Sequence, residues 1–183
     1  MAVDGPDVAR PDVLAARIAD RLPALGRPAV AVPASGFYRP ASVRLEHGRT
    51  DADARYSDWL DVGALTREVL AAVGPGGPGT YLPVLWDLER DRAARIPAHP
   101  MPAGGVLLVS GGLLQGVGLP FDLVVHLRVS AAARRRHTPA EQAWELAAYD
   151  RYDEEVDPAA LADAVVLSDH AERPALLLSG RLS

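Results

Sequence analysis

The chain contains no cysteine and no lysine among its 183 residues. Without cysteine it can form no disulfide, no thiolate nucleophile and no cysteine-based metal site. Without lysine it has no side chain for Schiff-base chemistry. All 19 basic residues are therefore arginine, and an arginine side chain can still bind phosphate through its planar guanidinium fork.

The chain also lacks any apolar run near the length of about 18 residues that a membrane span requires. Its first residues are not typical of a signal peptide, and its net charge of −5 favours neither nucleic-acid nor membrane binding. We therefore expect a cytoplasmic protein that binds no nucleic acid and no membrane. A hydrophobic content of 49% is typical of a globular protein, and we treat residues 1–183 as one domain.

The first twelve residues run from a short apolar segment through a turn into an amphipathic helix. This is the frame of a phosphate-binding loop, whose pattern is G-x-x-x-x-G-K-[ST]. Counted from Gly5, the second glycine, the lysine and the hydroxyl residue of that pattern are replaced by Arg10, Pro11 and Asp12. An ordinary capped helix with no relation to phosphate loops is an alternative interpretation of the same segment.

Each of these replacements works against phosphate. A phosphate loop binds through backbone N–H groups and the positive end of a helix dipole. Pro11 has no N–H, and Arg10 places a side chain where glycine lets the backbone approach the ligand. Asp12, together with Asp7, adds negative charge that can satisfy the helix dipole by itself. We therefore expect ATP and Mg²⁺ to bind weakly or not at all, and we expect no other cofactor.

Hydrophobic periodicity and turn residues divide the rest of the chain into alternating helices and strands. The segment 74–79 formally matches G-x-G-x-x-G, but it follows a helix and precedes a strand, so we predict a turn there. Residues 34–60 are expected to be irregular. Helices are expected over 11–25, 61–73, 130–138 and 139–155, and strands over 29–32, 80–87, 105–109, 121–129, 164–167 and 175–178. This alternation predicts an α/β fold with a mainly parallel sheet.

Six short segments follow one another in an order that is specific when they are taken together: Ala2–Gly5, Val32–Pro40, Tyr56–Asp61, Tyr81–Asp87, Val106–Gly111 and Ala162–Leu167. In this order they resemble six parts of the uridine kinase-like phosphate-loop nucleoside kinases. Those parts are the phosphate loop, the segment after the second strand, the Tyr-x-Asp-aromatic-x-Asp acceptor segment, the following strand, the Walker B strand and the last strand. The resemblance covers nearly the whole chain.

The resemblance implies a three-layer fold with a mainly parallel five-stranded sheet and a small lid around residues 130–140. The lid would carry Arg134, Arg135 and Arg136, although an exposed helix face is an alternative for these arginines. The acceptor pocket would be formed by Ser35, Tyr38, Arg39, Tyr56, Asp58, Asp61, Tyr81, Asp87 and Ser110. Carboxylates there could accept hydrogen bonds from sugar hydroxyls, and tyrosine rings could stack on a base. Helix caps and solvated loop acids are the alternative for the carboxylates.

Two positions besides the loop depart from the family. Ser35 stands where an aspartate usually accepts the proton of the acceptor hydroxyl, and Ser110 stands where an acid helps to hold magnesium. Phosphoryl transfer depends on such positioning and charge neutralisation. The histidines show no metal-ligand spacing, so we expect no metal site.

The sequence therefore favours a catalytically degenerate relative of uridine kinase that has lost productive ATP binding. We expect it to bind a small nucleoside-like or sugar-like ligand, a protein partner or a second copy of itself. One alternative is an enzyme that uses the acceptor pocket for ATP-independent chemistry. Another is a nucleoside-type kinase that is still active through an arginine-based phosphate site.

Overall fold

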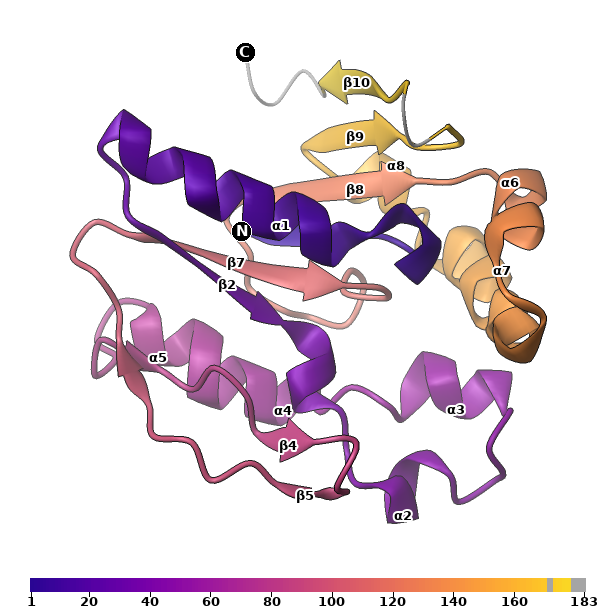
Figure 1. Cartoon of the computed structure of the whole chain (residues 1–183), viewed down its shortest axis with the longest axis horizontal. Helices are drawn as coiled ribbons and strands as arrows, with labels where there is room; N and C mark the ends of the chain where they lie inside the picture. The colour runs from indigo at the N-terminus through magenta and orange to yellow at the C-terminus, as the bar shows by residue number, and fades with distance from the viewer. Residues whose placement is uncertain (171–172, 179–183) are drawn as a thin grey trace.

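The computed structural model describes residues 1–170 and 173–178 and has a six-stranded sheet at its centre (Figure 1). Along the chain these strands are β1 (Ala2–Asp4), β2 (Ala29–Pro33), β7 (Val106–Gly111), β8 (Val124–Arg128), β9 (Ala164–Leu167) and β10 (Ala175–Leu178). Their order in the sheet is β10-β9-β8-β1-β7-β2. All neighbours are parallel except β10, which is antiparallel to β9. The predicted α/β fold with a mainly parallel sheet is confirmed, and β10 adds a sixth strand.

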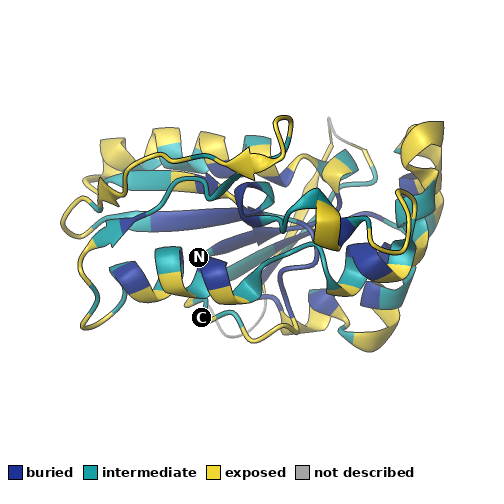
Figure 2. Ribbon diagram, turned by 90° about the horizontal axis from the view of Figure 1, so that it is seen from below, coloured by how far each residue is buried: buried dark blue, intermediate teal, exposed yellow. Residues whose placement is uncertain are grey.

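Helices cover both faces of this sheet. On one face, α1 (Pro11–Arg21) packs Leu14 and Ile18 against Leu108 of β7. On the other face, a continuous helical segment contributes Leu65 and Val69 to the core. This segment consists of α4 (Val62–Leu65), the π-helical turn η4 (Thr66–Leu70) and α5 (Ala71–Val73). Figure 2 shows the buried strands between helices whose outer faces are exposed, which gives the three layers expected.

Local signals set the boundaries of these helices as the sequence predicts. Asp61 caps α4, because its Oδ1 accepts a hydrogen bond from the backbone N–H of Ala64 at 2.8 Å. The first helix continues through the 3₁₀ turn η2 (Leu22–Leu25) and ends at Gly26, whose φ is 73°.

Two predictions about the middle of the chain are wrong. Residues 80–87 do not form a strand of the central sheet. Only β3 (Thr80–Tyr81) and β4 (Trp86–Asp87) are extended, and they pair with β6 (His99–Pro100) and β5 (Arg92–Ala93) in two separate small sheets. Pro83 interrupts the run, because it has no N–H for a ladder hydrogen bond.

Residues 34–60 are partly helical rather than irregular. They contain the 3₁₀ turn η3 (Ala34–Phe37) and the short helices α2 (Ala41–Arg44) and α3 (Ala52–Ser57). Asp51 caps α3 by accepting a hydrogen bond from the N–H of Ala54 at 2.7 Å. Helices this short have too few turns to produce an apolar periodicity, so the sequence pattern did not reveal them.

The remaining helices gather where the parallel strands end, together with α3 (Figure 1). They are α6 (Ala131–His137), the 3₁₀ turn η5 (Ala140–Glu145) and α7 (Leu146–Glu155), whereas α8 (Pro158–Leu161) begins at this edge and leads back to the start of β9. Open parallel sheets bind ligands at this edge. Among the described residues, no helix has the length and apolarity to cross a membrane.

Candidate functional site at the carboxyl edge of the sheet

The loop between β1 and α1 contains the 3₁₀ turn η1 (Asp7–Ala9) and one left-handed residue directly before the helix. That residue is Arg10, whose φ of 55° lies in the region that glycine adopts most easily. Pro11 follows as the first helical residue, where its missing N–H breaks no hydrogen bond within the helix. The backbone here therefore suits the second glycine of a phosphate loop, although the side chain is that of arginine.

Arg10 and Asp12 pair with each other at the N-terminus of α1. The Nε and Nη2 atoms of Arg10 lie 3.3 and 3.4 Å from the two carboxylate oxygens of Asp12. Both side chains are exposed, so this pair contributes little to stability. Asp12 nevertheless places negative charge in the first turn of the helix, where the dipole favours an anion.

The side chain of Tyr149, from α7, covers the start of this loop. Its hydroxyl lies against Gly112, and a Cβ atom at Gly112 would overlap with it and lie 3.1 Å from the carbonyl oxygen of Gly5. The cavity that remains beside the loop has a volume of about 20 Å³ and is lined by Asp7 and Glu145, among others. Such a volume holds about one water molecule. This cavity is therefore much smaller than a triphosphate.

The side chain of Arg55, in α3, is 3% exposed and lies among three aromatic rings. Its guanidinium carbon is 5.1 to 5.8 Å from the ring centroids of Trp59, Tyr38 and Tyr149, and its Nε donates to Glu145 Oε2 at 3.1 Å. Burial alone would lower the pKa of Arg55, but the surrounding tyrosines and Glu145 raise it above its usual value. Burial also raises the pKa of Glu145, against the lowering effect of Arg55. This buried pair joins α3 to η5 across the edge of the sheet.

The arginines of the expected lid differ in their surroundings. Arg134 is buried, and its Nη2 donates to Asp150 Oδ1 at 2.7 Å and to Asp153 Oδ2 at 2.8 Å. Arg135 also pairs with Asp150, at 2.9 Å, whereas Arg136 is exposed. Acids of α7 therefore neutralise two of the three charges in this conformation.

The nine candidate acceptor residues do not share one set of contacts. Tyr38 packs edge-on against Trp59, with ring centroids 5.6 Å apart. The hydroxyl of Tyr56 donates to Glu155 Oε2 at 3.0 Å, and Asp61 is the cap of α4 already described. These three side chains thus have structural partners within α3, α4 and α7.

Tyr81 and Asp87 lie on the two separate small sheets. The ring of Tyr81 packs against His99 at 5.9 Å. Asp87 accepts hydrogen bonds from the backbone N–H groups of Glu89 and Arg90, and its Oδ2 lies 2.8 Å from the Arg90 guanidinium. These hydrogen bonds from Arg90 lower the pKa of Asp87. Asp87 therefore acts within its own hairpin turn.

The other four candidates occupy element ends. Ser35 lies in η3, directly beyond β2, and Ser110 is a buried residue near the end of β7. Asp58 ends α3, and the carbonyl of Arg39 accepts a hydrogen bond from Arg44 Nε at 2.6 Å. Both serines are thus at the carboxyl edge of the sheet.

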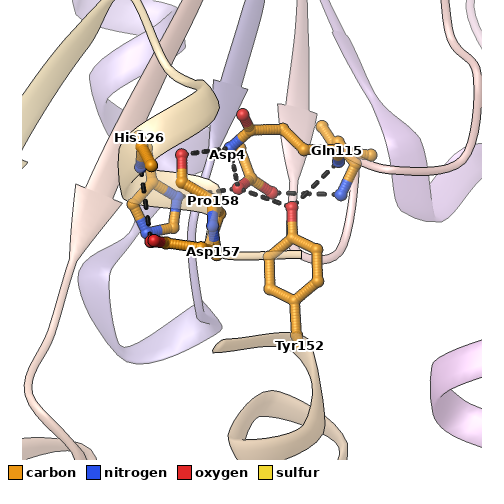
Figure 3. A network of polar contacts seen from close by, with 8 residues as sticks. Asp4, Gln115, His126, Tyr152, Asp157 and Pro158 are labelled. Atoms are coloured by element: carbon orange, nitrogen blue, oxygen red, sulfur yellow. Dashed lines mark hydrogen bonds and ion pairs between the residues drawn. The ribbon is translucent and has the colours of Figure 1, made fainter. Parts of the chain in front are cut away.

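A buried polar network that was not predicted from the sequence surrounds Asp4, the last residue of β1 (Figure 3). Asp4 is 0% exposed. Its Oδ2 lies 2.7 Å from His126 Nδ1 and accepts hydrogen bonds from the Tyr152 hydroxyl and Gln115 Nε2, both at 3.0 Å. Its Oδ1 accepts from the backbone N–H of Leu114 at 3.1 Å. Burial and the neighbouring Asp4 raise the pKa of Tyr152.

Two sequence signals could have identified this network. Asp4 interrupts an apolar strand directly before the loop, and His126 lies inside the apolar run of β8. A polar side chain at a core position needs partners, because an unpaired buried polar group costs free energy. The parallel register of β1 and β8 places Asp4 opposite His126.

Within residues 1–170 and 173–178, no group of three or more acidic or histidine side chains is arranged to hold a metal ion. Ser35 and Ser110 have hydroxyl groups rather than carboxylates at the carboxyl edge of the sheet.

Comparison with known proteins identifies the fold. No protein family and no curated protein matches the chain by sequence. A solved structure described as a possible uridine kinase from Bacillus stearothermophilus matches with a TM-score of 0.72 and 19% identity, covering 90% of this chain and 85% of the other. A protein from a Silicibacter species, described as a fructose transport system kinase, matches with a TM-score of 0.56 and 22% identity, covering 86% and 80%. The chain therefore has the phosphate-loop kinase fold that the sequence resemblance implied.

Proposed function

We propose that this chain, which has the fold of the phosphate-loop kinases, does not bind ATP productively and acts by binding a small ligand or a partner. The observation that carries this proposal is the covered loop between β1 and α1. Tyr149 covers the start of the loop, and the cavity left beside it has a volume of about 20 Å³. A site that has to accept a triphosphate would need this space and the positive charge that the loop has lost.

The chemistry of phosphoryl transfer supports the same proposal. The reaction relies on lysine, arginine and metal charges that neutralise the transferred phosphate. Here Arg134 and Arg55 are paired with Asp150, Asp153 and Glu145. Losing one electrostatic group typically reduces the rate about 10²–10³-fold. Several losses at one site would leave little activity.

Titration calorimetry with Mg-ATP tests this proposal directly. We expect no measurable binding, which corresponds to a dissociation constant weaker than about 1 mM. The physical reason is that Pro11 removes a backbone donor while Asp7 and Asp12 repel the phosphates. A panel of nucleosides, titrated separately, examines the acceptor side without the phosphates. A micromolar dissociation constant for Mg-ATP would contradict the proposal.

A triple variant, Arg10→Gly with Pro11→Lys and Asp12→Thr, is expected to bring Mg-ATP binding into the millimolar range. The left-handed backbone at Arg10 already suits glycine, and lysine supplies the missing ammonium. We expect no comparable gain in turnover, because Ser35 and Ser110 still lack carboxylates.

The matched control for this experiment carries Pro11→Ala in place of Pro11→Lys, with the other two changes kept. It restores the backbone N–H without the ammonium, so comparison of the two variants isolates the effect of the charge. Full kinase activity in the lysine variant would show that Ser35 and Ser110 do not occupy the base and metal positions.

A further inference from the structure

A second hollow lies at the same edge of the sheet, on the side of β8 away from the covered loop. Its volume is about 420 Å³, and it lies between the end of β8, the start of α6 and the start of α8. This volume falls within the range of small-molecule sites. The cavity beside the loop is about twenty times smaller.

One of the residues that line this hollow is His126, which is 4% exposed. Its Nδ1 faces Asp4 Oδ2 at 2.7 Å, and Figure 3 shows this contact within the network. An ionised carboxylate only accepts hydrogen bonds, so the proton of a neutral imidazole is on Nδ1 and Nε2 is left as an acceptor. Within residues 1–170 and 173–178, Nε2 has no hydrogen-bond partner. Because Asp4 occupies Nδ1, Nε2 is the ring nitrogen through which His126 could bond to a ligand in the hollow that it lines.

The other polar groups around the hollow provide both donors and acceptors. Arg128 is exposed and offers its guanidinium. One oxygen of Asp157 caps α8 by accepting from the Ala160 N–H at 3.4 Å, which leaves the second oxygen available. The remaining carboxylate, Asp153, is paired with Arg134 at 2.8 Å. With Asp153 paired, the lining presents one further carboxylate and one guanidinium, those of Asp157 and Arg128, so charge of neither sign predominates.

The rest of the lining is formed by short apolar side chains, which include Val129, Ala131, Pro158 and Ala159. A monosaccharide presents both kinds of surface, since its ring has apolar C–H groups and its edge carries hydroxyl groups. Each hydroxyl can donate to a histidine nitrogen or a carboxylate and can accept from an arginine.

We propose that this hollow binds an uncharged polyhydroxylated ligand of about monosaccharide size, with a ligand hydroxyl donating to His126 Nε2 and Arg128 donating to another. The inference rests on the proposed function as a ligand-binding protein and names the site and the class of its ligand. Arg128 and His126 come from the same strand, two residues apart, so their side chains leave β8 on the same face.

Nuclear magnetic resonance of the full chain labelled with ¹⁵N-histidine tests the proposal. The probes are D-ribose and D-fructose, with ribose 5-phosphate as a charged comparison. The spectrum of a His126→Asn variant assigns the His126 signals among those of the five histidines. We expect the free protein to show His126 protonated on Nδ1, and we expect at least one of the two sugars to shift the Nε2 signal in a saturable way.

Two variants test the site, one at exposed Arg128 and one at buried His126. Arg128→Ala removes an exposed side chain and should weaken sugar binding about tenfold, the effect of one hydrogen bond to a charged group. Arg17→Ala, on an exposed position of α1, is the matched control and should leave the affinity unchanged. His126→Asn should abolish binding, since its amide can still donate to Asp4 but Nε2 is absent.

The possible results separate this inference from the proposed function. No saturable shift with either sugar up to tens of millimolar overturns the ligand class. Sugar binding that leaves the His126 signals unchanged, or that Arg128→Ala does not weaken, overturns the site while the proposed function stands. Tighter binding of ribose 5-phosphate than of ribose overturns the uncharged class. Micromolar binding of Mg-ATP, measured in the same series, would instead contradict the proposed function.

Discussion

Replacing Asp4 with alanine is expected to lower the free energy of unfolding by about 3–5 kcal/mol, measured by urea denaturation. The carboxylate is fully buried and is the shared acceptor for His126, Tyr152, Gln115 and the Leu114 N–H. Each buried donor that loses its acceptor costs about 1–3 kcal/mol, and the losses are not additive.

Two further variants define the origin of this effect. Asp20→Ala, on an exposed position of α1, is the matched control and should change stability by no more than about 0.5 kcal/mol. Asp4→Asn keeps the volume but turns an amide nitrogen toward other donors, so it should also be clearly destabilised. A wild-type stability for Asp4→Asn would show that the network does not require a carboxylate.

Replacing Arg55 with alanine is expected to destabilise the chain by about 3–5 kcal/mol, because it leaves the carboxylate of Glu145 without its partner at a largely buried position. It also removes the cation that lies among the rings of Tyr38, Trp59 and Tyr149. Denaturant unfolding followed by tryptophan fluorescence measures this loss, since Trp59 reports on the same cluster.

Two further variants separate the effect of losing the charge of Arg55 from the effect of losing its packing. Arg55→Met keeps much of the volume, and the double variant with Glu145→Gln removes both charges. We expect the double variant to be more stable than Arg55→Met alone, because the unpaired carboxylate is then gone. Arg17→Ala again serves as the exposed control. A stability of Arg55→Ala within about 0.5 kcal/mol of the wild type would contradict the described burial of this pair.

Elements with strong local signals were predictable from the sequence. Pro11 at the first helical position, the Asp61 cap and Gly26 after the first helix each act within a few residues, so their effect is visible in a short window. The strand β7 begins with the continuous apolar run Val106–Val109, which is typical of a parallel sheet. The strand predicted over 80–87 is wrong because Pro83 interrupts the run, and its two ends pair in separate small sheets.

The candidate site was predictable only where it consists of one contiguous segment. The replacements at Arg10, Pro11 and Asp12 are visible in the sequence, because the phosphate-loop pattern has fixed spacing. By contrast, two of the expected acceptor residues have partners that the residue types do not reveal: Asp87 pairs with Arg90, three positions away, and Tyr56 bonds to Glu155, 99 positions away. Residue types alone do not show which of these side chains lie close together in the folded chain.

By itself, then, the sequence determined the α/β alternation, the helix ends and the departure of residues 5–12 from the phosphate-loop pattern, since these depend on local backbone preferences and short spacings. Only the tertiary structure decided what occupies the edge of the sheet. His126 and Tyr152 reach Asp4 across 122 and 148 positions of the chain, and Arg55 reaches Glu145 across 90. Apolar periodicity indicates which face of an element is buried, but it does not identify the partner. The partners are fixed only when the whole sheet and its helices pack. Buried polar groups are then paired with donors or acceptors that are distant in the sequence.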